Sequence, residues 1–130
     1  MADVVALAEA VAAELDDYHA EVLFCPEFEL RDIEEMKVVV VPLAVEFKAA
    51  SRTAREEVMK IQIGFLMRSD EDDLDGLLHT VEELGLSFLG KKLAGATCVG
   101  AAFNPLYSPE HLRERRQFTS VIELAFAKFC

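Results

Sequence analysis

The segment MKIQIGFLMR, residues 59–68, decides the fold because its side chains alternate between two faces. Met59, Ile61, Ile63, Phe65 and Met67 fall on one face, and this period of two is typical of a strand. A face so apolar must be covered by another layer of structure, since exposing it to water is unfavourable. The segment therefore predicts a long strand inside a sheet that packs against helices or a second sheet.

The segments on either side predict further strands. KVVVVP, residues 37–42, is β-branched throughout its middle and ends at a proline. Residues 21–30 are strand-like around Pro26, which favours an edge position or a break. Residues 97–103 and 118–126 predict the last two strands. The pattern weakens after residue 42, and residues 48–57 predict a mobile loop or a hairpin arm.

Two amphipathic stripes predict helices. In residues 2–18, apolar side chains recur three and four positions apart, and Asp3 can cap the start. The second helix follows the acidic run SDEDD, residues 69–73, which suits a helix N-terminus. Its stripe runs from Leu74 to Leu84, with an end expected near Gly85 or Gly90. Residues 104–110 predict turns, followed by one helical turn over residues 110–115.

These elements predict a single α+β domain that spans residues 1–130. The economical arrangement is one mainly antiparallel sheet of about five strands with two helices packed on one face. With 130 residues, the chain is long enough for one domain of ordinary size. Its 52% content of hydrophobic residues predicts a real core and excludes a disordered tail.

The charge is strongly negative and unevenly distributed. The chain has 24 acidic and 13 basic residues. Residues 1–36 carry eleven acids and one base, residues 70–89 carry seven acids and no base, and the two segments between and after them are net basic. This distribution argues against stable nucleic-acid binding, which needs clustered cations. It suits head-to-tail docking between copies of the chain, although acids on the solvated faces of two helices are the simpler explanation.

The sequence predicts no membrane segment and no thiol site. No run approaches the roughly 20 apolar residues of a membrane helix, and the acidic start resembles no signal peptide. Cys25, Cys98 and Cys130 are odd in number and lack metal-ligand spacing. We expect Cys25 and Cys98 to be buried in a protein of a reducing compartment, and Cys130 to be exposed.

We find no catalytic, cofactor or metal motif, and we expect a protein that is not an enzyme. His19, His79 and His111 lie far apart in sequence. A nucleophilic pair of Cys98 with His79 or His111 would depend on the fold, with no local support. The acidic cluster at residues 70–75 lacks the ligand pattern of a calcium loop, and helix capping explains it better.

Two arginine groups remain as candidates for contact with acidic surfaces. Arg52 and Arg55 lie in the segment of residues 48–57, and Arg115 and Arg116 precede the last strand, together with Arg113. Guanidinium groups bind carboxylates through paired hydrogen bonds, so these arginines are interface candidates. The alternative is that they serve solubility alone.

The order of these segments carries a family resemblance over residues 4–127. An opening helix is followed by PEFEL (residues 26–30), an acidic turn, and VVVVP (residues 38–42). A loop ending at Ser51 and Arg52, the long strand and the acidic-capped helix come next. The connector NPLYSPE (residues 104–110) and QFTSVIEL (residues 117–124) close the chain. In this layout the chain resembles the tail-terminator, or tail-completion, proteins of long-tailed bacteriophages and prophages.

The resemblance implies a structural role without catalysis. Such proteins form hexameric rings that sit on the last ring of the tail tube, stop its growth and offer a docking face to the head-tail connector. It implies a homo-oligomer in the virion tail or neck, assembled in the bacterial cytoplasm. Two alternatives remain open: a head-closure protein of the same neck region, and a small non-catalytic α+β module that binds a ligand or a protein.

Overall fold

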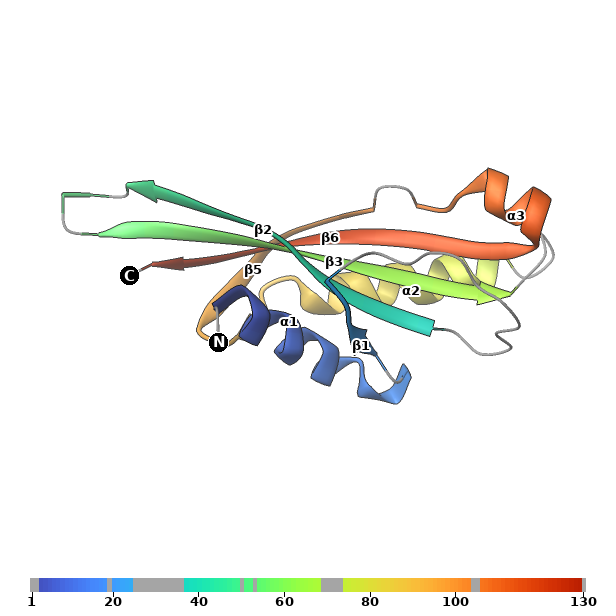
Figure 1. Ribbon diagram of the computed structural model, residues 1–130, viewed down its shortest axis with the longest axis horizontal. Coiled ribbons are helices and arrows are strands. Elements are labelled where there is room, and N and C mark those ends of the chain that lie inside the picture. Colours follow the sequence, from blue (N-terminus) through green and yellow to red (C-terminus); the bar gives the residue numbers. More distant parts are fainter. Residues whose placement is uncertain are drawn as a thin grey trace.

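A computed structural model describes residues 3–18, 20–24, 37–49, 51–52, 54–68, 74–103 and 106–129 of the chain (Figure 1). The first half contains helix α1 (Asp3–Glu14), the 3-10 helix η1 (Asp16–Tyr18), and strands β1 (Glu21–Val22), β2 (Lys37–Ala49) and β3 (Arg55–Arg68). The second half contains helix α2 (Leu74–Phe88), strands β4 (Lys92–Leu93) and β5 (Ala96–Phe103), helix α3 (Pro109–Arg115) and strand β6 (Gln117–Phe129).

The six strands form one mixed sheet in the order β1-β2-β3-β6-β5-β4. Strand β1 runs parallel to β2, and every other neighbouring pair is antiparallel. Strands β3 and β6 are central and pair along nearly their whole length, from Glu56 opposite Phe129 to Arg68 opposite Gln117. The long strand predicted from residues 59–68 is therefore the middle of the sheet.

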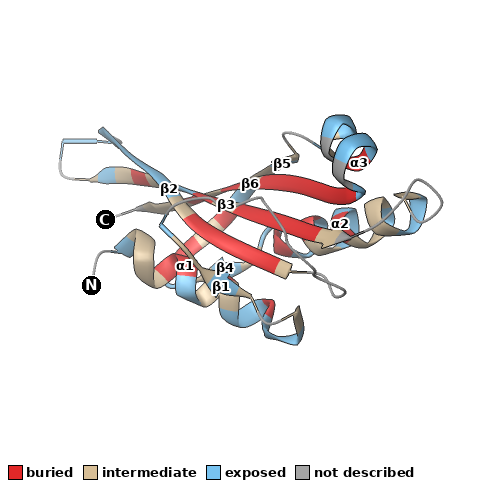
Figure 2. Ribbon diagram, turned by 45° about the vertical axis from the view of Figure 1, so that its right-hand side comes forward, coloured by how far each residue is buried: buried red, intermediate tan, exposed pale blue. Residues whose placement is uncertain are grey.

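The main core lies on the face of the sheet that carries α1 and α2 (Figures 1 and 2). Ile63 stands at its centre, opposite Val40 on β2 and Ile122 on β6. Leu7 and Val11 of α1 are fully buried against this face, as the stripe in residues 2–18 predicts. Burying apolar surface stabilises the fold by roughly 25 cal/mol per Å² removed from water, so these two helices fix the sheet.

A second, smaller cluster lies on the opposite face of the sheet. It joins the buried side chains of Val39, Val41 and Leu66, with Leu23 packed against them. Strand β3 is thus covered on both faces near Leu66, whereas its alternation predicted a single strongly apolar face. A strand buried on both sides is typical of a sheet centre.

The predicted fold class was wrong. We expected about five strands in a mainly antiparallel sheet with two helices, and the structure has six strands in a mixed sheet with three α-helices. Strands β1 and β4 are each two residues long, too short to show a hydrophobic period. The parallel pairing of β1 with β2 follows from the long connection between them, which lets the chain return in the same direction.

Several predicted boundaries also differ from the observed ones. Strand β2 continues past Pro42 to Ala49, with an irregularity in register between Pro42 and Ala44 that accommodates the proline. Residues 48–49 and 55–57 belong to strands, so a hairpin arm, one of the two alternatives, occupies the segment expected as a loop. The predicted strand at residues 21–30 is confirmed only at Glu21 and Val22, and residues 25–30 lie outside the described part.

Helix α2 approaches the sheet most closely at Gly85. A Cβ atom at this position would lie 2.5 Å from Cδ1 of Ile122 and 3.3 Å from Cζ of Phe103. The end of the fully buried Ile122 side chain would therefore have to shift to admit a Cβ atom at residue 85. Gly85 therefore allows the helix to lie close over β5 and β6. Gly76 on the same helix has no such contact within 4 Å.

We predict that Gly85→Ala destabilises the protein and that Gly76→Ala does not. Overpacking at residue 85 costs about 1–3 kcal/mol, against a gain of about 1 kcal/mol in helix propensity. At residue 76 only the propensity gain remains. Urea unfolding followed by circular dichroism measures both, and a Gly85→Ala protein as stable as Gly76→Ala would contradict the close packing.

Candidate functional site

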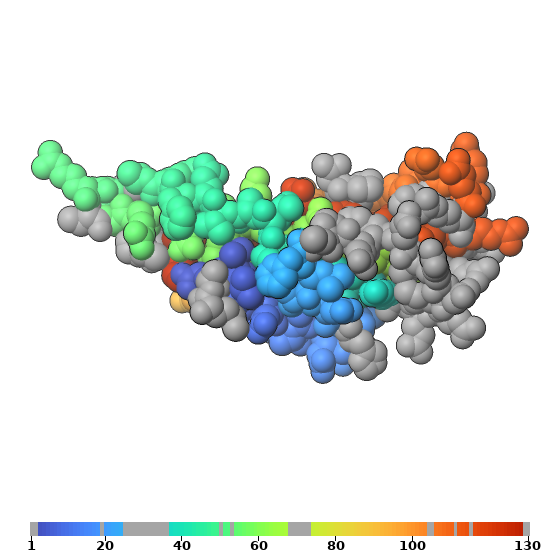
Figure 3. Space-filling view, in the orientation of Figure 1, coloured from blue at the N-terminus to red at the C-terminus, as the bar shows by residue number. Residues whose placement is uncertain are grey.

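The candidate site is a hairpin arm formed by residues 43–49 of β2 and 55–60 of β3, with the described tip residues 51, 52 and 54. Residues 43–49 are all exposed, whereas Val38 to Val41 earlier in the same strand are buried (Figure 2). In the space-filling view the arm projects beyond the rest of the molecule at one end (Figure 3). Strand β2 therefore runs from the core at one end to an exposed sheet edge at the other. Strand β3 stays paired with β6 as far as Glu56, and its residues Glu57 and Met59 remain buried.

The arm combines apolar and cationic side chains on its exposed surface. Phe47 is 62% exposed, and Leu43 and Val45 are also exposed. The guanidinium carbon of Arg55 lies 6.0 Å from the centre of the Phe47 ring, which is a cation-π distance. Phe47, Arg52 and Arg55 line an open hollow of about 540 Å³ at the tip. An aromatic ring beside guanidinium groups is a common composition for the centre of a protein interface.

The tip is held by local hydrogen bonds and carries excess positive charge. The backbone N–H of Ser51 donates to the carbonyl of Ala54 over 3.1 Å, and the N–H of Ala54 donates to the Ser51 hydroxyl over 3.0 Å. Lys48 lies 3.9 Å from Glu46. Arg52 and Arg55 have no carboxylate partner among the described residues, so both guanidinium groups can bind an anionic surface.

The two predicted arginine groups lie at opposite ends of the sheet. Arg55 begins β3 at the arm, whereas Arg116 lies next to Gln117, which pairs with Arg68 at the far end of β3. A strand of this length spans about 45 Å, so the four arginines do not form one patch. Arg116 is exposed, and the side chain of Arg115 lies outside the described part. The arm alone brings a predicted pair, Arg52 and Arg55, together.

Arg116 has a structural constraint of its own. Its φ angle is 50°, in the left-handed region that non-glycine residues rarely adopt. It directly follows α3, so it occupies the position where helices commonly end with a left-handed residue. The strain at Arg116 is therefore explained by helix termination.

The acidic residues lie on the exposed sides of α1 and α2. On α1 and η1 the exposed acids are Asp3, Glu9, Glu14, Asp16 and Asp17, and on α2 they are Asp75, Glu82 and Glu83. Neither helix carries a lysine or an arginine. The molecule therefore has acidic helices on one face of the sheet and a basic arm tip at one end.

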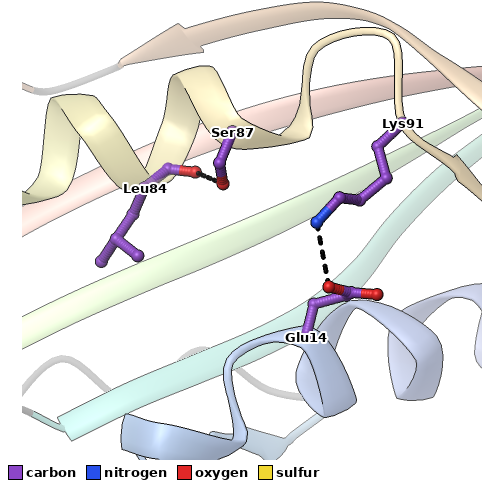
Figure 4. Close-up of polar contacts among 4 residues, drawn as sticks. All are labelled: Glu14, Leu84, Ser87 and Lys91. Atoms are coloured by element: carbon purple, nitrogen blue, oxygen red, sulfur yellow. Dashed lines mark hydrogen bonds and ion pairs between the residues drawn. The ribbon is translucent and has the colours of Figure 1, made fainter.

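Two of these acids bind lysines within the molecule. Lys91 Nζ lies 2.9 Å from a carboxylate oxygen of Glu14, which links the segment after α2 to α1 (Figure 4). Lys91 also lies 5.5 Å from the centre of the Phe88 ring. Lys128 Nζ lies 3.2 Å from Asp3. Exposed pairs of this kind contribute about 0–1 kcal/mol each, so they orient the two helices more than they stabilise them.

A second surface, an apolar groove, was missed by the sequence analysis. It lies between α2 and β5, has a volume of about 290 Å³, and is lined by Gly85, Leu86, Leu89, Phe103 and the acidic Glu82, among others. Leu86 is 64% exposed and Leu89 is 46% exposed. Leu86 and Leu89 do not belong to the predicted apolar stripe of α2. Apolar side chains outside that stripe were the sequence feature that could have indicated an exposed apolar surface.

The pairing of Cys98 with His79, an alternative that the sequence did not favour, does not form in the described residues. Cys98 is buried in the core, where its thiol donates to the carbonyl of Gly100 over 3.5 Å. Burial raises the pKa of the Cys98 thiol, which disfavours the reactive thiolate. His79 is exposed and pairs with Glu83 on α2 at 3.1 Å. The prediction that Cys98 is buried is confirmed.

The described part of the chain contains no cluster of three or more metal-ligating side chains. Several predicted features lie outside it: Cys25, Cys130, His19, the acidic residues 70–73 and the side chain of His111. None of the described helices is long and apolar enough to cross a membrane.

No protein-family model matches this chain, and no curated protein sequence matches it.

We predict that Arg116→Gly raises the free energy of unfolding by about 0.5–1 kcal/mol. Glycine adopts a positive φ without steric cost, so the strain at the end of α3 is relieved. Arg113→Ala, an exposed change within α3, should stay within about 0.5 kcal/mol of the wild type. Thermal and urea unfolding test both variants, and a destabilised Arg116→Gly protein would show that the side chain makes an important contact.

The raised pKa of Cys98 predicts a pH dependence of stability. Above the ordinary thiol pKa of 9.0 the unfolded chain loses this proton before the folded protein does. The wild type should therefore lose stability above about pH 9, by at most about 1.4 kcal/mol per pH unit from this group. Urea unfolding of the wild type and Cys98→Ala from pH 7 to pH 10 tests this, and parallel curves for the two proteins would contradict it.

Proposed function

We propose that this chain is a structural subunit of the tail of a long-tailed bacteriophage or prophage. In this proposal copies of the chain form a ring, six-membered by the family resemblance, on the last ring of the tail tube. The ring ends tube growth and presents a docking face to the head-tail connector. The protein acts through its contacts, at the head end of the tail, and is assembled in the host cytoplasm.

The observation that carries this proposal is the hairpin arm. Residues 43–49 are exposed on the outer strand of the arm, and the guanidinium of Arg55 lies at a cation-π distance from the Phe47 ring. Exposed aromatic and aliphatic side chains lie here beside guanidinium groups that have no carboxylate partner in the described part of the chain, and this combination favours an interaction surface. A protein with such an arm and no reaction centre among its described residues is best understood as an assembly subunit.

The charge distribution also supports a ring. A closed ring of identical subunits uses a heterologous interface, in which two different surfaces of one subunit meet. Such surfaces must be complementary, and the chain has a basic arm tip and acidic helices α1 and α2. A negatively charged ring also lets DNA pass through its opening without strong binding, because it offers few cations to the phosphates.

The test is to mix the purified protein with tail tubes isolated from the phage or prophage that encodes it. We expect ring-shaped particles at the tube ends by electron microscopy, and oligomers at high concentration by light scattering. Arg52→Glu combined with Arg55→Glu should reduce both, because charge reversal at the arm tip removes its complementarity. Arg113→Glu, an exposed change on α3, is the matched control. A monomeric protein that leaves the tube ends bare would overturn the proposal.

A further inference from the structure

The sheet has two open edges that lie on opposite sides of the molecule. On one side, β1 pairs with β2 only at Val39 and Val40, so residues 43–49 have no outer strand partner among the described residues. On the other side, β4 pairs with β5 only at Ala96 and Thr97. The backbone of Cys98 still bonds to Gly90 and Lys91, but residues 99–103 have no outer partner in the described part.

The β2 edge has a proline and a register irregularity at Pro42 to Ala44, and β5 has an irregularity at Cys98 to Gly100, but residues 45–49 and 101–103 beyond them are regular strand edges. Their unpaired N–H and C=O groups are a template for another strand, and proteins usually block such edges with charges, prolines or bulges. Here the two edges are separated by the full width of the sheet, in the order β1-β2-β3-β6-β5-β4. One molecule therefore cannot satisfy its own edges, whereas two copies can pair them.

The side chains at the two edges are complementary in polarity. Val45 and Phe47 lie on the helix-bearing face of the sheet, since they pair in register with Met59 and Glu57, which share that face with Ile61. The apolar groove between α2 and β5 opens on the same face. If residues 43–49 of a second copy paired along β5 with their helix-bearing face on the same side, Phe47 would lie beside Leu86, Leu89 and Phe103. The groove volume of about 290 Å³ is large enough for an aromatic ring.

The charges at the two edges are complementary as well. Arg55 lies against the Phe47 ring. If Phe47 entered the groove, Arg55 would therefore lie at its rim, where Glu82 is. Glu83 is exposed on the same turn of α2, and α2 carries no lysine or arginine. Cationic side chains of the arm thus meet the acidic side of the helix. This charge pairing favours binding of the arm to the β5 edge over binding to the β2 edge of another copy.

From these observations we infer that the hairpin arm of one copy adds as a strand to the open edge of β5 in the next copy, with Phe47 in the groove between α2 and β5. The inference rests on the proposed ring and specifies its subunit interface. It differs from a general attraction between acidic and basic faces, because it names a backbone pairing and an aromatic anchor.

The test uses one variant in each half of the interface. Phe47→Ala removes the aromatic ring from the arm, and Leu86→Asp places a negative charge in the groove. We expect each to weaken self-association about tenfold or more, measured by light scattering and analytical centrifugation in solution and by occupancy of isolated tube ends. Phe24→Ala is the matched control, because Phe24 is 70% exposed and lines neither the arm tip nor the groove.

Mixing the two variants tests the head-to-tail geometry directly. The Phe47→Ala protein keeps an intact groove, and the Leu86→Asp protein keeps an intact arm. The mixture should therefore form one-to-one dimers and nothing larger, because each pair has one working interface. Likewise, Arg55→Glu and Glu82→Arg should each weaken assembly, and the double variant should recover it.

The outcomes separate this inference from the proposed function. Rings that persist in Phe47→Ala and Leu86→Asp overturn the inference and leave the tail role standing. Protection of the arm amides from hydrogen exchange by tubes, but not by self-association, identifies a strand of the tube as the occupant and also overturns it. A wild-type protein that neither self-associates nor binds tube ends overturns the proposed function and the inference together.

Discussion

The structure depends on one central strand, β3, which is buried over most of its length and on which the exposed residues 43–49 of β2 are built. Ile61, Ile63 and Phe65 are fully buried beneath α1 and α2, and β2 and β6 pair with β3 on both sides. Strand β3 pairs with β6 without a register shift from Phe65 to Glu56, and β2 pairs with β3 on both sides of the irregularity between Pro42 and Ala44. The packing of the core therefore also orients Phe47 and Arg55. A flexible loop of the same composition would bind more weakly, because binding would have to order it and so reduce its conformational entropy. The hairpin is already ordered in the folded protein, so binding does not carry this cost.

Part of this architecture was readable from the sequence, for physical reasons that differ between elements. Residues 59–68 and the stripe of α2 show long, regular periods, and they form the strand and the helix that these periods predict. The two-residue strands β1 and β4 have no period to read, and their pairing depends on the path of the chain. Residues 43–49 alternate, with Leu43, Val45 and Phe47 at every second position. They follow Pro42, however, which marks the end of a strand in a sequence, and the register irregularity between Pro42 and Ala44 that lets β2 continue shows only in the structure.

The arginines of the arm were predicted from the sequence, whereas the groove between α2 and β5 was not. Arg52 and Arg55 were identifiable because two arginines in a segment without apolar periodicity must face water or a partner. Leu86, Leu89 and Phe103 come from separate segments, and only the close approach of α2 to Ile122 at Gly85 brings them into one groove. Single residues show their chemistry in a sequence, but a concave surface between two elements exists only after they pack.

The placement of charge explains why the open edges would favour a ring over a symmetric pair. Two arms that met each other would bring Lys48, Arg52 and Arg55 of both copies together, and two grooves that met would bring Glu82 and Glu83 together. Both symmetric pairings are opposed by like charges, whereas arm against groove joins opposite ones. An interface between two different surfaces leaves one of each free on every dimer, so growth continues until the rotation between copies closes a ring. The acidic helices and the basic arm thus act together: they attract the correct edge, and they repel the two pairings that would end assembly early.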